Sequence, residues 1–388
     1  MNAVYVVGTA RSPIASVQAG NTDEIVNTSV ISSLSPVELG EQVLRHLIRE
    51  SSIDPMNIQF FFMGSAISQK VERSMYQAPA KFVFRRATLG QNIPVIARTV
   101  EKACSTGLVS IWCAAKKIII GKAEIAIAGG VDMMSRQANG VILNGLTDPT
   151  TGKLMAQLAD QKALELGDGF GREAHDACAL ASYERAKATA HDHALVPIRL
   201  LGVEMPVLTY DTEIEKYGNR LKVLSKIRPY PGCKIMTVLN SAKYGDAAAF
   251  LMLASENAVR EKNLRPLARI VAFAEHSEED PKDFIIAPAG AAIKALAVAG
   301  LQADEIDYWE INEAFPTSSL YVMKKCGVPH EKINPCGGAI AHGHPIGATG
   351  GCLAVKNIMI CRKMKKRYGI VVVCNAISEA TAMIFEMV

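Results

Sequence analysis

The sequence predicts an α/β protein built from two similar layered halves with a lobe inserted between them. Short β-branched runs alternate with longer helical stretches, which is typical of a mainly parallel sheet covered by helices. Between about residues 129 and 240 this pattern loosens, and Gly, Pro, Thr and Asp interrupt it. A fresh strand then opens at Ala268, so the last third of the chain looks like a second sheet-and-helix unit.

Each predicted strand is a short apolar run bounded by turn residues. The predicted strands are residues 4–7, 60–63, 124–128, 268–273 and 370–374. Helical spacing predicts helices over residues 36–50, 107–120, 171–191, 247–262, 290–299 and 350–366. The last strand lacks polar alternation, as expected for a strand that is buried on both faces.

These elements divide the chain into a first half, an insertion and a second half. We expect residues 1–120 to begin the N-terminal half and residues 121–245 to form the inserted loop domain. Residues 246–266 then complete the N-terminal half, and residues 267–388 form the C-terminal half.

Composition and charge exclude several classes of protein. Hydrophobic residues make up 49% and charged residues 21% of the 388 residues, which permits a large core and excludes a disordered or collagen-like chain. The net charge is only +4 and no long basic block is present, so we expect no nucleic-acid partner. No apolar run approaches the roughly 20 residues of a membrane-spanning helix, so we expect no membrane insertion.

The N-terminus and the cysteines predict the compartment. The chain enters a strand-like run at Val4 without a signal or transit segment, so we expect a cytoplasmic protein, or a mitochondrial one if a leader is missing. The nine cysteines are odd in number and scattered, and they form no Cys-x-x-Cys pair. This pattern favours a reducing compartment and predicts neither a disulfide scaffold nor a metal site.

Cys104 precedes an apolar helical run and is the first candidate for chemistry. A thiol at a helix N-terminus meets the positive end of the helix dipole and free N–H groups, which lower its pKa from about 8.5 and favour a nucleophilic thiolate. A cysteine is more often a small buried hydrophobic residue, so for Cys104 taken alone a structural role in the core is preferred to a catalytic one.

A glycine-rich segment, residues 334–351, contains His342 and His344. Pro345 suits the first position of a helix, and the glycines let the backbone approach a ligand, so His344 is a candidate base for a thiol. The alternative is a glycine-rich turn with a capping histidine. His342 lacks the same placement and is expected to be a support or a bystander.

Two further candidates lie at strand ends: Asn312 and Glu313 at the end of another strand-like run, which begins at Trp309, and Cys374 at the end of the predicted strand 370–374. Asn312 can hold a water or donate to an oxyanion, and Glu313 can orient a histidine, although simple surface placement is about as plausible. Cys374 ends a buried strand, where α/β proteins often place their sites, but a thiol in such a run is ordinarily filler.

At these positions the sequence resembles the thiolase family, nearly from end to end. The nucleophile segment of that family looks like residues 103–107, its Asn-Glu-Ala-Phe box matches residues 312–315, and its Gly-Gly-Ala…Gly-His-Pro-x-Gly box matches residues 337–347. Residues 145–148, 269–274 and 309–315 are most similar to the biosynthetic acetyl-CoA acetyltransferase branch. The resemblance implies the thiolase fold, with αβαβα layers and an inserted loop domain.

The resemblance also implies roles for individual residues. Cys104 would be the nucleophile that takes the acyl group, and His344 would accept its proton. Cys374 would remove a proton from the α-carbon of the second acetyl-CoA. Asn312, through a water, and His344 would form one oxyanion hole, and the backbone N–H groups of Cys104 and Ala376 would form the other.

The substrates follow from the same resemblance. A ping-pong reaction through acyl-Cys104 would interconvert two acetyl-CoA with acetoacetyl-CoA and CoA, with no metal and no cofactor apart from these thioesters. Leu146, Met155 and Phe315 match positions that line the acetyl pocket. Lys216 matches a basic position near the nucleotide end of CoA.

Two segments depart from the family pattern. A glycine-rich loop normally follows the acid/base cysteine, but here residues 375–380 read Asn-Ala-Ile-Ser-Glu-Ala. Ala376 can still offer its N–H unless its φ must be positive, and Glu379 would raise the pKa of the nearby thiols. Ala242 and Lys243 stand where the family has Ser and Gly, which would remove a hydrogen bond to the pantetheine arm.

Quaternary structure and two alternative functions complete the expectations. The excursion that joins two thiolase dimers is mostly missing between residues 135 and 145, so we expect a homodimer, paired through the edge strand of the first sheet, rather than a tetramer. One alternative is a degradative 3-ketoacyl-CoA thiolase with a longer acyl pocket. The other is a weakly active or inactive acyl-CoA-binding protein. β-Ketoacyl synthases share the fold but use two histidines, which Cys374 and Asn312 disfavour.

Overall fold

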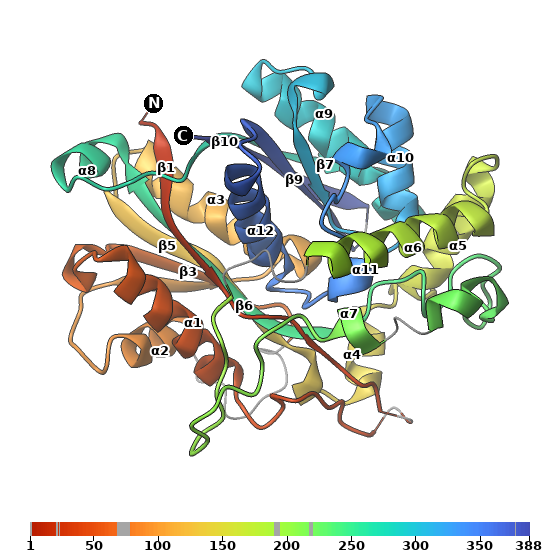
Figure 1. The fold of residues 1–388 in the computed structure, drawn as a ribbon, viewed down its shortest axis with the longest axis horizontal. Coiled ribbons are helices and arrows are strands. Elements are labelled where there is room, and N and C mark those ends of the chain that lie inside the picture. The colour runs from red at the N-terminus through yellow and green to blue at the C-terminus, as the bar shows by residue number, and fades with distance from the viewer. Residues whose placement is uncertain are drawn as a thin grey trace.

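The computed structural model describes residues 2–20, 22, 24–67, 78–189, 195–216, 220–376 and 378–388. In this part of the chain one path of paired strands runs in the order β4-β3-β5-β6-β1-β7-β10-β9-β8, with β2 paired to β6 (Figure 1). The strands are β1 (Val4–Arg11), β2 (Ala15–Ser16), β3 (Phe60–Gly64), β4 (Ile96–Val100), β5 (Ile125–Met133), β6 (Gly245–Ser255), β7 (Ala268–Ser277), β8 (Tyr308–Ile311), β9 (Tyr368–Asn375) and β10 (Glu379–Met387).

Helices cover both faces of this sheet path and also form the segment between β5 and β6. They are α1 (Pro36–Ser51), α2 (Pro79–Ala87), α3 (Thr106–Ile119), α4 (Asn139–Gly145), α5 (Met155–Leu166), α6 (Arg172–Thr189), α7 (Glu213–Lys216), α8 (Glu256–Glu261), α9 (Ala287–Ala299), α10 (Pro316–Cys326), α11 (Ala339–His342) and α12 (Thr349–Lys363). No helix among the described residues has the length and apolar character needed to cross a bilayer.

The side chains of the strands alternate between two packing layers. In β5, Ile125 and Ile127 pack into the core under α1 and α2, whereas Ala126 and Ala128 face the core around α3 and α12. In the second half, Val371 faces α3 and α12, and Val372 faces α9 and α10. The α3 and α12 pair therefore lies between two sheet halves, which confirms the predicted α/β class (Figure 1).

The two sheet halves meet at β1 and β7. Only Tyr5 and Val6 pair with Ala268 and Arg269 across this junction, whereas β1 pairs with β6 along almost its whole length. Helices α4 to α7 lie between β5 and β6 in the chain, where the sequence predicts the inserted lobe. The domain boundaries proposed from the sequence stay predictions.

One predicted helix, residues 247–262, is wrong. The structure has strand β6 over Gly245–Ser255, and only the short helix α8 follows it. The run Ala-Ala-Ala-Phe-Leu-Met-Leu has high helix propensity, but every residue of β6 is buried between β1 and β5. A strand covered on both faces shows no alternation, so tertiary burial overrides the local preference.

The other predicted elements agree apart from their ends, and several elements were not predicted. The predicted helix 171–191 is present as α6, and residues 190 and 191 lie outside the described residues. Strands β2, β4 and β10 and helices α2, α4, α5, α7, α10 and α11 are additional. β10 (Glu379–Met387) has only three residues of high strand propensity, Thr381, Ile384 and Phe385, so its sequence signals a strand weakly.

Glycines let α3 and α12 approach closely near their N-termini. A Cβ atom added to Gly107 would lie 2.6 Å from the backbone nitrogen of Gly351, and one added to Gly350 would clash with the nitrogen of Leu108. Because Cys104 precedes α3 and His344 precedes α12, this contact brings the two segments together.

We expect Gly107→Ala to lower the free energy of unfolding by about 1–3 kcal/mol, because the added methyl group overpacks the α3–α12 contact. Urea denaturation monitored by circular dichroism measures this change. Gly171→Ala is the matched control, since a Cβ there meets nothing within 4 Å. Equal effects of the two substitutions would show that the close approach does not matter.

Candidate active site

Cys104 lies in a single turn, Ala103–Ser105, directly before α3. Ala103 has a φ of 42°, a left-handed conformation that is strained for a residue with a side chain. The N–H of Lys102 donates to Thr106 Oγ1 at 2.7 Å and fastens the turn to the helix. The turn thereby presents a half-buried thiol at the start of the helix.

His344 contacts this thiol, with its Nε2 at 3.3 Å from Cys104 Sγ. On the other side of the ring, Nδ1 lies 2.7 Å from Thr349 Oγ1, whose hydroxyl donates to the carbonyl of Pro345 at 2.9 Å. The hydroxyl proton is therefore engaged, and Thr349 accepts the hydrogen of Nδ1. This network assigns the tautomer whose Nε2 lone pair faces the thiol, as a general base requires.

Burial favours the neutral form of both partners. Burial and the neighbouring Cys374 raise the pKa of the Cys104 thiol well above its usual value, although a backbone N–H favours the anion. Burial lowers the pKa of His344 to about 4. The expectation that the helix N-terminus lowers the pKa of Cys104 is therefore wrong, since loss of solvation outweighs the backbone N–H groups.

Cys374 and Asn312 are brought together by two parallel strands. Asn312 follows β8 and Cys374 lies near the end of β9, and the N–H of Asn312 donates to the carbonyl of Val372 at 2.8 Å. The Nδ2 of Asn312 lies 3.7 Å from Cys374 Sγ. Burial raises the pKa of Cys374 to about 12, and the hydrogen bond from Asn312 opposes this shift.

A cavity of about 710 Å³ opens onto these groups. Its lining includes the predicted residues Cys104, His344, Cys374, Ala376, Leu146, Met155, Phe315 and Lys216. Asn312 is fully buried behind Cys374 and is not part of the lining. Two thiols and one imidazole therefore line the same cavity.

The cavity wall also contains apolar residues that sequence reasoning missed. Phe284 packs edge-on against Phe315, with the ring centroids 6.5 Å apart. Leu143, Ile346 and Tyr244 extend the same wall. Of these residues, only Ile346 lies in a motif named in the sequence analysis, the Gly-His-Pro box. The positions of the others on the cavity wall follow from the tertiary fold.

The unusual turn after Cys374 keeps Ala376 on the cavity wall. The left-handed conformation in this turn falls on Ser378, with a φ of 65°, and Ile377 lies outside the described residues. Glu379 lies 3.2 Å from Lys102 Nζ. Its charge is therefore paired, which weakens the expected effect of Glu379 on the thiols.

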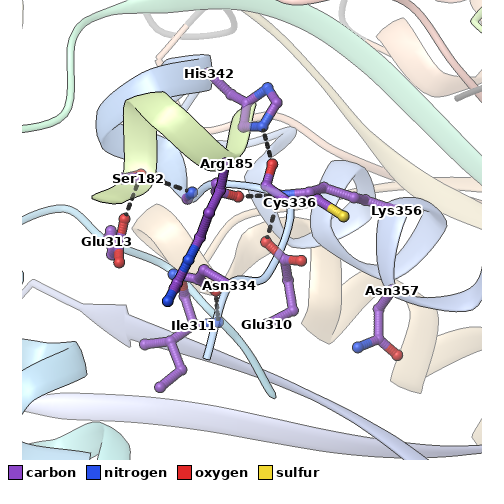
Figure 2. A network of polar contacts seen from close by, with 12 residues as sticks. Ser182, Arg185, Glu310, Ile311, Glu313, Asn334, Cys336, His342, Lys356 and Asn357 are labelled. Carbon is purple, nitrogen blue, oxygen red and sulfur yellow. Dashed lines mark hydrogen bonds and ion pairs between the residues drawn. The ribbon is translucent and has the colours of Figure 1, made fainter. Parts of the chain in front are cut away.

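A buried polar network holds the segment that leads to His344 (Figure 2). The side chain of Asn334 accepts from the N–H of Ile311 at 2.8 Å and donates to its carbonyl at 3.0 Å. Lys356 contacts Glu310 at 3.0 Å and also donates to the carbonyl of Gly337. The network ties the glycine-rich segment to β8 and therefore to Asn312.

His342 and Glu313 belong to this support. The ring nitrogens of His342 lie 2.8 Å from Asp211 and 2.8 Å from the carbonyl of Cys336. Glu313 accepts from Ser182 at 2.9 Å, and its described contacts include no histidine. The prediction that Glu313 orients a histidine is therefore wrong.

Among the described residues, no group of three or more His, Cys, Asp or Glu side chains is arranged to hold a metal ion. The prediction that the reaction needs no metal remains a prediction.

Comparison with known proteins gives a consistent result. The chain is 31% identical to the cytosolic acetyl-CoA acetyltransferase of Gibberella zeae, over 99% of this chain and 98% of that one. It superposes on the Bacillus anthracis acetyl-CoA acetyltransferase with a TM-score of 0.89 and 27% identity, covering 100% and 99% of the two chains. Human mitochondrial 3-ketoacyl-CoA thiolase, solved also with CoA, matches with a TM-score of 0.87 and 25% identity, covering 100% and 99%.

Family models match both halves of the chain. The model for the thiolase N-terminal domain matches residues 4–141, and that for the thiolase C-terminal domain matches residues 264–387. With the fold, the paired thiol and imidazole and the second thiol in one cavity, these matches show that the chain belongs to the thiolase family.

Proposed function

We propose that this acyltransferase interconverts two acetyl-CoA with acetoacetyl-CoA and CoA. The observation that carries the proposal is the contact between His344 Nε2 and Cys104 Sγ, at a cavity that also exposes Cys374. The acetyl-CoA acetyltransferases among its relatives support this choice of substrate.

In the first half-reaction, Cys104 Sγ attacks the thioester carbonyl while His344 Nε2 takes the thiol proton. The imidazole of His344 is unprotonated at neutral pH, and so available to accept this proton, because burial lowers its pKa to about 4. The oxyanion would accept hydrogen bonds from the backbone N–H groups of Cys104 and Ala376. Collapse of the tetrahedral intermediate breaks the bond to the CoA sulfur, which takes the proton of Cys374 as it leaves, so that Cys374 becomes a thiolate while His344 keeps the proton from Cys104.

In the second half-reaction, Cys374 removes a proton from the α-carbon of a second acetyl-CoA. The donor Asn312 Nδ2 favours the thiolate of Cys374. Asn312 Oδ1 is buried and has no partner among the described residues, so it can accept from a water whose other proton stabilises the enolate oxygen, together with His344. The enolate forms a carbon–carbon bond to the acyl carbonyl carbon, the bond from that carbon to Cys104 Sγ breaks, and the Cys104 thiolate regains its proton from His344, while Cys374 keeps the proton from the α-carbon.

A degradative 3-ketoacyl-CoA thiolase is the second candidate. The TM-score to human mitochondrial 3-ketoacyl-CoA thiolase is nearly as high as that to the Bacillus anthracis acetyl-CoA acetyltransferase. Leu146, Met155 and Phe315, which match acetyl-pocket positions in the family resemblance, all lie on the cavity wall, and this favours the acetyl group over a longer chain. A series of 3-ketoacyl-CoA substrates separates the two functions, because a preference for long chains would contradict the proposal.

The edge strand β4 supports a homodimer. Among the described residues, β4 pairs with β3 on one side only, and Ile96 is half exposed at its start. An unpaired edge with exposed apolar side chains is a ready pairing surface for a second copy. The dimer and a cytoplasmic location stay predictions.

The acyl-enzyme is tested by intact mass spectrometry after incubation with acetyl-CoA. We expect one acetyl adduct on the wild-type protein and on Cys374→Ala, no adduct on Cys104→Ala, and no condensation by either variant. Cys326→Ala removes a thiol on α10 and is the control. We expect it to keep both the acetyl adduct and the condensation activity. An adduct on Cys104→Ala contradicts the assignment, and CoA-ester binding without any wild-type adduct supports a binding protein instead.

The buried neutral His344 predicts a pH dependence of stability. Its pKa is about 4 when folded, against an ordinary 6.5, so the unfolded chain binds the extra proton between these values. The fold therefore has its full stability from this group above pH 6.5 and loses it as the pH falls toward 4. Between pH 7 and pH 5 we expect His344→Gln to lose roughly 1–2 kcal/mol less than the wild type. Urea denaturation at both pH values measures this difference, and equal losses would argue against a buried neutral imidazole.

We expect sedimentation velocity to show a dimer of the 41.7 kDa chain and a monomer for Ile96→Lys. The substitution places two like charges at a symmetric edge and costs association energy. Val298→Lys, on α9 and 65% exposed, is the control and stays dimeric. A wild-type monomer or tetramer, or a dimeric Ile96→Lys, contradicts pairing through β4.

A further inference from the structure

Lys243 is a buried lysine on the wall of the same cavity. Its Nζ donates to Tyr183 Oη at 2.7 Å, and to the carbonyls of Leu239 and Ile340 at 3.3 Å each. The ammonium also lies 5.1 Å from the centre of the Tyr183 ring. One side chain therefore joins α6, the segment before β6, and the short helix α11 that precedes His344.

The main chain of Lys243 holds His344 itself. The N–H of His344 donates to the carbonyl of Lys243 at 2.8 Å, and Tyr244 forms a parallel bridge with His344. Between Ile340 and His344 lies Gly343, whose φ of 103° places it in a conformation that few other residues adopt. Lys243 thus contacts the chain on both sides of Gly343, at Ile340 and at His344.

The charge of the Lys243 side chain decides how many of its three hydrogen bonds form. An ammonium has three N–H donors for its three oxygen acceptors, whereas a neutral amine has two. Burial lowers the pKa of Lys243 to about 7, Glu213 on α7 opposes this shift, and Lys216 on α7 adds to it. Tyr183 of α6 relays between the two buried charges, since its hydroxyl donates to Glu213 at 3.4 Å.

We propose that Lys243 is a positioning residue for His344. The side-chain ammonium and the backbone carbonyl of Lys243 together hold the segment from Ile340 to His344, so that Nε2 of His344 faces Cys104. This inference rests on the proposed function, in which His344 accepts the proton of Cys104. The thiolase family has glycine where Lys243 stands. The contacts of the lysine side chain are therefore a feature of this chain's own sequence.

The test is the rate at which iodoacetamide alkylates Cys104, followed by peptide mass spectrometry from pH 6 to pH 9. The sulfur displaces iodide and passes its proton to His344, so the rate reports their contact without any CoA substrate. At pH 6 we expect Lys243→Met to react roughly tenfold more slowly than the wild type, approaching His344→Ala, since small misplacements of a base are costly. The difference should shrink above pH 7, where the wild-type ammonium loses its proton.

Lys262→Met is the matched control, an exposed lysine on the chain just after α8, and should react at the wild-type rate. A folded Lys243→Met that reacts at the wild-type rate at every pH overturns the proposal. If Lys243→Met does not fold, Tyr183→Phe removes one acceptor of the ammonium and should slow alkylation several-fold. A wild-type rate in Tyr183→Phe then overturns the proposal.

The outcomes separate this inference from the proposed function. Alkylation that depends on Lys243 in a protein without acetyl transfer supports the positioning role and contradicts the function. Acetyl transfer with alkylation independent of Lys243 supports the function and overturns the positioning role.

Discussion

The contact between the N-terminal ends of α3 and α12 is the constraint on which the rest of the structure depends. Gly107 lies against Gly351 with no room for a Cβ atom, so the turn before α3 and the segment before α12 must meet. Cys104 belongs to the first and His344 to the second, and the two side chains touch as a result. The sheet halves on either side then place Cys374 at the same point.

Burial of this meeting point determines its acid–base character. A thiol and an imidazole in water would titrate near neutrality, but here loss of solvation favours the neutral form of each. The pair therefore holds a thiol and a free base rather than a stable ion pair. Cys374 is disfavoured as a thiolate in the same way, and Asn312 offers it a hydrogen bond that opposes this effect.

Buried polar groups around the site specify position more than they add stability. The ion pair of Lys356 with Glu310 and that of Arg11 with Asp211 are almost completely buried, and such pairs repay little beyond their desolvation. Each is tied to the glycine-rich segment, through the carbonyl of Gly337 or through His342. A loop rich in glycine has many conformations, and these contacts select one. The side chain of Lys243 adds another contact to this segment, at the carbonyl of Ile340.

The sequence by itself determined the α/β class and the segments that carry the chemistry, because strand periodicity and the boxes around Cys104, Asn312 and His344 are local patterns. Only the tertiary structure decided that residues 245–255 form a central strand, since burial on both faces removes the alternation that marks one. It also decided the acid–base states of the site and the apolar wall that includes Phe284. These properties depend on solvent exclusion by segments hundreds of residues apart, which no local pattern contains.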